Sequence, residues 1–137
     1  MTETTGPAAE APILAEEADA AALLREVADV DGFRRACVVD PGSGTVLAVR
    51  PRTDDVDALA AGAADLFHVL TVMGAQSAIE GETEDLVVTT SDEQHLVRVL
   101  HRGAGESRLL VLTLDRRHSR LPLAWRSLRT AGAPDGD

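Results

Sequence analysis

Residues 23–48 read LLREVADVDGFRRACVVDPGSGTVLA, and they predict a helix followed by a β-hairpin. Apolar side chains recur at spacings of three and four across residues 16–28, which is typical of one helix face. The members of this face are Ala20, Leu23, Leu24 and Val27. Asp31-Gly32 should end the helix, and the turn PGSG should then separate strands at 33–40 and 45–50. The apolar run ACVV inside the first strand indicates a central strand that is covered on both faces.

The rest of the chain predicts a long helix, three strands and a final helix. The long helix should begin after Asp54 or Asp55 and run to about Ile79. The strands are expected at 85–90, 94–101 and 107–115, and the last of them should be central because its run LLVLTL is apolar on both faces. The last helix should start near Ser119 with Pro122 in its first turn and bury Leu121, Trp125 and Leu128. The order α-β-β-α-β-β-β-α predicts an α/β (α+β) domain with a mixed five-stranded sheet and helices on both faces. The long helix is then the crossover between the two groups of strands.

The long helix carries two neighbouring strips of residues. The larger apolar side chains form one seam: Val56, Leu59, Ala63, Leu66, Leu70 and Met73. The other strip is mostly small: Ala60, Ala64, Phe67, Thr71, Gly74 and Ala78. One seam would suffice to cover a sheet, and small residues let a second helix approach closely. We therefore expect this helix to be covered on more than one side.

Length and composition indicate one small globular domain. The 137 residues are 45% hydrophobic and only 2% aromatic, so the core must be built from Leu, Val and Ala. We place the domain at 16–130, with a disordered acidic tail at 1–15 and a disordered tail at 131–137. The chain has no Lys, Asn or Tyr, which indicates a GC-rich, bacterial genome. No apolar run of membrane-span length and no signal-peptide pattern is seen, so we expect a cytoplasmic protein.

The distribution of charge excludes one class of function and leaves another open. A formal net charge of −10 argues against nucleic-acid binding, which needs a basic face. Residues 116–129 nevertheless hold five arginines and no acid: Arg116, Arg117, Arg120, Arg126 and Arg129. These arginines could pack near the acidic first helix, or Arg116, Arg117 and Arg120 could form a docking patch for an acidic partner. An arginine finger, which would act at a γ-phosphate, is a third alternative.

No catalytic, cofactor-binding or metal-binding constellation can be found in the sequence. The PGSG turn lacks the lysine of a phosphate-binding P-loop, and no Gly-x-Ser-x-Gly segment is present. His95 and His101 would lie roughly 20 Å apart along one strand, too far to share a metal ion. Surface or capping positions are expected for the histidines, and Cys37 is expected to be a small buried hydrophobe. We therefore predict that the protein is not an enzyme and needs no cofactor.

In the order of its predicted elements and in its local sequence, the chain resembles the roadblock/LC7 family, which has a profilin-like architecture. The matching segments are residues 23–48, the Ala-rich helix DALAAGAADLFHVL at 57–70, and RLLVLTLDRRHSRLPLAWRSL at 108–128. The resemblance implies a homodimer in which the long helices pack together and the third strands pair into one continuous sheet. It also implies a scaffold or regulator of Ras-like small GTPases.

On this basis we predict a dimer interface on the long helix and on the edge strand that follows it. Its residues are Ala60, Ala64, Phe67, Thr71, Gly74, Leu86 and Val88. Pairing of that strand with its copy would also remove an apolar edge that is prone to aggregation. The alternative function is a small-molecule-sensing domain, because mixed sheets with a crossover helix also serve as ligand pockets.

Overall fold

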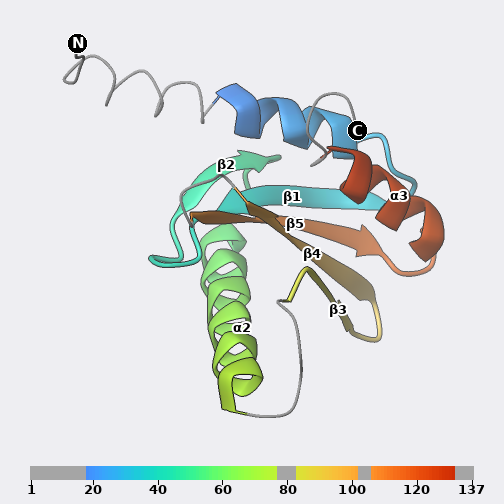
Figure 1. Cartoon of the computed structure of the whole chain (residues 1–137). Coiled ribbons are helices and arrows are strands. Elements are labelled where there is room, and N and C mark those ends of the chain that lie inside the picture. Colours follow the sequence, from blue (N-terminus) through green and yellow to red (C-terminus); the bar gives the residue numbers. More distant parts are fainter. Residues whose placement is uncertain (1–17, 77–82, 102–105, 132–137) are drawn as a thin grey trace.

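The computed structural model describes residues 18–76, 83–101 and 106–131, which form a five-stranded sheet with helices on both faces (Figure 1). A first helix is described at residues 18–27. The elements that follow are β1 (Phe33–Val39), β2 (Val46–Arg50), α2 (Val56–Gln76), β3 (Asp85–Thr89), β4 (Glu93–His101), β5 (Ser107–Asp115) and α3 (Leu121–Ala131). The predicted order of elements is confirmed. The predicted tails lie outside the described residues, except Ala131, which is buried at the end of α3.

The sheet is entirely antiparallel, so the predicted mixed sheet is wrong. The strand order is β2-β1-β5-β4-β3, and each of the four neighbouring pairs is antiparallel. Helix α2 does connect two strands that run in the same direction, as a crossover helix should. These strands, β2 and β3, lie at opposite edges of the sheet, however, with β1, β5 and β4 between them. The crossover therefore creates no parallel pair of neighbours.

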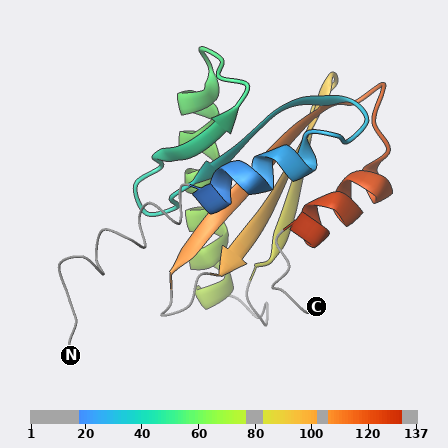
Figure 2. The same ribbon diagram turned by 90° about the horizontal axis from the view of Figure 1, so that it is seen from above.

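Two layers of helices cover the two faces of the sheet. Helix α2 lies on one face, and the first helix and α3 lie side by side on the other (Figures 1 and 2). Successive side chains of β5 point to opposite faces of the sheet, so this strand contributes to both cores. Leu109 and Val111 pack on the α2 side, and the residues on the other side are Leu110, Leu112 and Leu114. As predicted, β1 and β5 are central strands with an apolar residue on each face. Of the three residues predicted to be buried on α3, only Leu128 is; Leu121 and Trp125 are half-buried.

Gly32 makes the turn that joins the first helix to β1. Its φ angle is +82°, a left-handed conformation that residues with a Cβ rarely adopt. A Cβ at this position would lie 2.9 Å from the Cβ of Ser119, and the Gly32 carbonyl accepts a 2.7 Å hydrogen bond from the backbone N–H of Asp115. The glycine therefore permits a close approach between the start of β1 and the loop that precedes α3.

Only the N-terminal half of α2 packs against the sheet. Its buried side chains come from both strips that the sequence distinguishes: Val56, Ala60, Ala63 and Ala64, with Leu59 and Phe67 partly buried beside them. Beyond Phe67 the helix stands clear of the strands in Figure 1, and most of its side chains are exposed. By length and hydropathy, residues Val56–Gly74 could also cross a membrane, with a mean hydropathy of 1.5. The first half of this segment contributes to the core of the domain, but only 22% of the segment is buried, so packing within the chain explains its apolar composition only in part.

Candidate interaction site

The predicted interface residues on α2 divide into two groups. Ala60 is fully buried in the core against the sheet, and Ala64 is 6% exposed and lies beside the β1–β2 turn near Gly44. Phe67 is half-buried and packs against the same core. Ala60 and Ala64 are thus buried within their own chain and cannot meet a partner as they stand, whereas the interface role of Phe67 stays a prediction. Thr71 is exposed and donates a 2.8 Å hydrogen bond to the Phe67 carbonyl, while Gly74 is half-buried with open space where a Cβ would stand.

The exposed side of α2 is apolar instead. Leu66 is 42% exposed, Val69 51% and Met73 48%, and Val72 lies beside them. We call these four residues the α2 apolar face. Spacings of three and four residues place Leu66, Val69 and Met73 along one side of the helix. A contiguous apolar patch of this kind is unusual on a surface that only water covers, and it commonly marks a contact with another protein.

Strand β3 is an edge of the sheet. It pairs only with β4, so one row of its backbone donors and acceptors is unpaired within the described residues. Leu86 packs against the α2-side core, and the alternation of the strand places Val88 on the same side. Val87 and Val88 are both among the exposed large apolar residues. An exposed apolar edge strand is a template for pairing with another strand.

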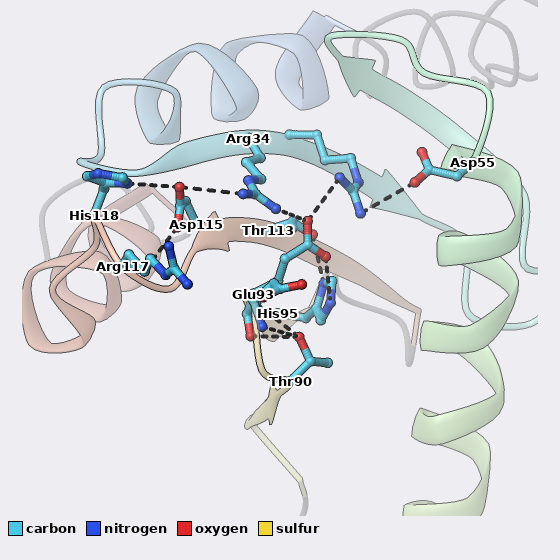
Figure 3. A network of polar contacts seen from close by, with 11 residues as sticks. Arg34, Asp55, Thr90, Glu93, His95, Thr113, Asp115, Arg117 and His118 are labelled. Atoms are coloured by element: carbon cyan, nitrogen blue, oxygen red, sulfur yellow. Dashed lines mark hydrogen bonds and ion pairs between the residues drawn. The ribbon is translucent and has the colours of Figure 1, made fainter.

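A polar cluster fills the α2 side of the sheet beyond the N-terminus of α2 (Figure 3). We define it as Arg35, Glu93, His95 and Thr113. His95 Nδ1 lies 2.9 Å from Thr113 Oγ1, and His95 Nε2 lies 3.4 Å from Glu93 Oε1. Arg35 lies 3.6 Å from Glu93 and 3.5 Å from Asp55, the residue immediately before α2. The cluster thus links β1, β4 and β5 to the start of α2.

The electrostatics of this cluster follow from its burial. Removal from water lowers the pKa of His95, and Arg35 adds to that effect, while Glu93 opposes it. The pKa of Asp55 is also lowered, first by the hydrogen bond from the Thr53 hydroxyl and then by Arg35. Arg35 Nε is buried and has no hydrogen-bond partner among the described residues. A neutral His95 is therefore favoured in this environment.

The chain of contacts from Glu93 through His95 to Thr113 resembles the carboxylate, histidine and hydroxyl of a catalytic triad, but these residues cannot act as one. Thr113 is fully buried, so its hydroxyl cannot reach a substrate, and the His95–Glu93 distance is longer than a good hydrogen bond. The contacts are structural. His95 was expected at the surface, and its half-buried position is a correction. The available signal was the two-residue alternation of β4, which places Glu93 and His95 on the same face as the buried Val97 and Val99.

The arginines near α3 are only partly engaged. Arg116 donates a 3.0 Å hydrogen bond to the Thr90 carbonyl, and Arg129 bonds Asp85 at 2.9 Å. Arg117 and Arg120 are exposed and form no ion pair within residues 18–76, 83–101 and 106–131. The described part of the first helix therefore does not neutralise them, which leaves these two guanidinium groups available to solvent.

An open cleft of about 500 Å³ lies between the β1–β2 turn, α2 and the start of β5. Its lining residues include Asp40, Phe67, His68, Glu106 and Arg108. Ligand pockets of this volume are usually apolar and enclosed, with a few converging polar groups. This cleft has one aromatic side chain and charges of both signs, so it offers little with which to orient a small molecule.

Three solved structures share this arrangement of elements. The gliding protein MglB from Thermus thermophilus is 24% identical, with a TM-score of 0.70 over 86% of each chain. MglB from Myxococcus xanthus is 16% identical, with a TM-score of 0.72 over 85% of this chain and 84% of that one. The roadblock/LC7 domain from Streptomyces avermitilis is 18% identical, with a TM-score of 0.65 over 84% and 89%. The chain has the roadblock/LC7 fold.

The roadblock/LC7 fold predicted from the sequence is thus confirmed. No family model and no curated protein matches the chain by sequence. At these identities the likeness concerns the fold of the backbone. In this roadblock/LC7 fold, the α2 apolar face and the β3 edge are both exposed to solvent.

Proposed function

We propose that the protein is a non-enzymatic homodimer that acts as a scaffold or regulator with a bacterial Ras-like small GTPase system. One observation carries the proposal: a roadblock/LC7 fold here exposes both the α2 apolar face and an apolar β3 edge that is unpaired within the described residues. Exposed apolar side chains and unpaired strand backbone groups are both unfavourable at a surface exposed to water. A second copy of the same chain would bury the first and form hydrogen bonds with the second.

A two-fold axis through the β3 edge accommodates both contacts. Antiparallel pairing of β3 with its copy continues the sheet across the dimer, and each α2 then lies on the same side of that sheet. The proposed interface keeps Thr71, Gly74, Leu86 and Val88. It keeps Phe67, which is half-buried, and gains Leu66, Val69 and Met73 in place of Ala60 and Ala64, which are buried in their own chain. Self-association is also known for the fold, since MglB has been seen in a tetrameric arrangement.

The GTPase partner rests on the resemblance to roadblock/LC7 proteins. The two MglB structures support it through the similarity of their backbone fold, and MglB itself is described as a gliding protein. A chain of this size has little to offer except its surface, and a symmetric dimer doubles that surface. A cytoplasmic location would suit such a partner.

The exposed Arg117 and Arg120 are the proposed docking patch for an acidic surface of the partner, with Arg116 at its edge. Arg117 and Arg120 form no ion pair with the described part of the first helix, which favours docking over pairing within the chain. A rim patch of this kind speeds association more than it deepens affinity, and salt weakens its effect.

We propose that the protein is not an enzyme because its possible nucleophiles and metal ligands are unsuited to catalysis. The Thr113 hydroxyl is buried, and no three metal-ligating side chains gather within the described part of the chain. Cys37 is buried, and burial raises the pKa of its thiol to about 12, so it is a poor nucleophile. A small-molecule sensor is the second candidate, and the 500 Å³ cleft beside His68 is the feature that would serve it.

Binding to purified small GTPases from the same genome tests the proposal. Each GTPase is loaded with GDP or with a non-hydrolysable GTP analogue, and its affinity for the protein is measured by titration calorimetry. We expect saturable binding to one GTPase with a preference for one nucleotide state. Failure of every Ras-like GTPase of the host to bind in either state would contradict the proposal. Nucleotide turnover by the protein alone would contradict its non-enzymatic part.

A further inference from the structure

The polar cluster lies one strand away from the edge that the proposed dimer uses. His95 on β4 stands directly opposite Val88 on β3, and the side chains of both are on the α2 side of the sheet. Neighbouring strands are about 4.8 Å apart, so His95 is within two strand spacings of a β3 strand from a second copy. Figure 3 shows Glu93, His95 and Thr113 to one side of α2.

The charged groups around His95 would compensate only partly for a positive charge on its imidazole. Glu93 accepts a 2.7 Å hydrogen bond from Arg34 and lies 3.6 Å from Arg35, so its charge is already shared between two guanidinium groups. Asp55, before α2, is 3.5 Å from Arg35, and Asp115 on β5 is 3.4 Å from Arg34. The groups nearest to His95 on β5 and β3 are Thr113 and Val88, which are uncharged.

We propose that protonation of His95 weakens the association of two copies across this face, so that the affinity of the dimer falls as the pH is lowered. The inference rests on the dimer proposed above. Its physical basis is desolvation: His95 has a side chain that is only 16% exposed in the single chain, and a second copy over this face removes more water from it. A buried imidazolium that is not fully paired costs more free energy than a neutral imidazole.

The direction of the pH dependence follows from linkage. Burial in the single chain already lowers the pKa of His95 from its ordinary value of 6.5, and further burial in the dimer lowers it again. The separate chains therefore bind more protons than the dimer does. Affinity is complete above the pKa of His95 in the single chain and is lost as the pH falls through it. The loss approaches about tenfold per copy for each pH unit below that value.

The test is the dissociation constant of the dimer between pH 8 and pH 5.5, measured by sedimentation at constant ionic strength. For the unmodified protein we expect Kd to rise towards the acid end of this range, by at most about tenfold per copy for each pH unit below the pKa of His95. His95→Gln keeps a hydrogen-bonding group but cannot titrate, so its Kd should stay constant. His101→Gln, on the same strand at an exposed position, should behave as the unmodified protein does. A thermal melt at each pH verifies that the chains are folded, and His95→Asn replaces His95→Gln if that variant does not fold.

The possible results separate this inference from the proposed dimer. A dimer with the same Kd at pH 8 and pH 5.5, or one whose pH dependence survives in His95→Gln, overturns the inference and leaves the dimer in place. A monomer at pH 8 overturns both. Loss of pH dependence in His101→Gln as well as in His95→Gln would assign the effect to overall charge and would also overturn the inference.

Discussion

His95 and Thr113 face one another on adjacent antiparallel strands, and His95 Nδ1 and Thr113 Oγ1 are 2.9 Å apart. Thr113 is the one buried polar residue in the described core, so this hydrogen bond compensates for its hydroxyl. Thr113→Val keeps the shape of the side chain and leaves the imidazole without that partner. We expect the free energy of unfolding to fall by about 1 to 2 kcal/mol, measured by urea denaturation. Thr89→Val on the exposed edge strand is the control and should change it by less than about 0.5 kcal/mol; equal effects would contradict this role for the hydrogen bond.

Two glycines should respond in opposite directions to the same change. Gly32→Ala must hold an alanine at φ +82° with its Cβ 2.9 Å from Ser119 Cβ, and we expect a loss of about 1 to 3 kcal/mol. Gly62 lies within α2 with nothing within 4 Å of an added Cβ, so Gly62→Ala should raise stability by about 0.5 to 1 kcal/mol. Thermal melts that moved in the same direction for both variants would refute this account of the turn.

Cys37 should be unreactive in the folded protein. Burial raises the pKa of its thiol from 9.0 to about 12, so the reactive thiolate is scarce at pH 8, and the surrounding core shields the sulfur. A chromogenic disulfide reagent at pH 8 should label less than one tenth of the native protein within minutes, and all of it in denaturant. Rapid stoichiometric labelling under native conditions would show that β1 is not a covered central strand.

The proposed arginine dock predicts a separation of binding from stability. Arg117→Glu combined with Arg120→Glu should slow association with the GTPase and leave the melting temperature nearly unchanged, because neither residue forms an ion pair within the described part of the chain. Arg126→Glu, also exposed on α3, is the control for net charge. A lower melting temperature with unchanged binding kinetics would support internal pairing of these arginines instead.

The sequence predicted the succession of elements because periodicity and turn residues are local signals. The pattern of Leu109 to Leu114 was enough to place β5 in the centre of the sheet. It could not reveal that β2 and β3 lie at opposite edges, because strand neighbours are fixed by contacts between distant segments. The faces of α2 were misassigned for a related reason. Its two strips are both apolar, and the sheet contacts the boundary between them, at Val56, Ala60 and Ala63.

The polar cluster was missed because its residues come from three strands. Arg35, Glu93 and Thr113 are far apart in the chain, and only the register of β1, β4 and β5 brings them together. His95 was consequently expected at the surface. The arginines proposed as a docking patch could be picked out from the sequence because they are clustered in one short segment, and their docking role stays a prediction.

The molar mass in solution tests the central claim most directly. Light scattering at micromolar concentration and pH 8 should give twice the chain mass of 14.4 kDa for the unmodified protein. Val69→Arg places a charge in the middle of the α2 apolar face and should give the mass of a single chain. Leu123→Arg changes a residue of similar exposure on α3 and should leave the dimer intact. A single-chain mass for the unmodified protein, or a dimer that is insensitive to Val69→Arg, would contradict the account.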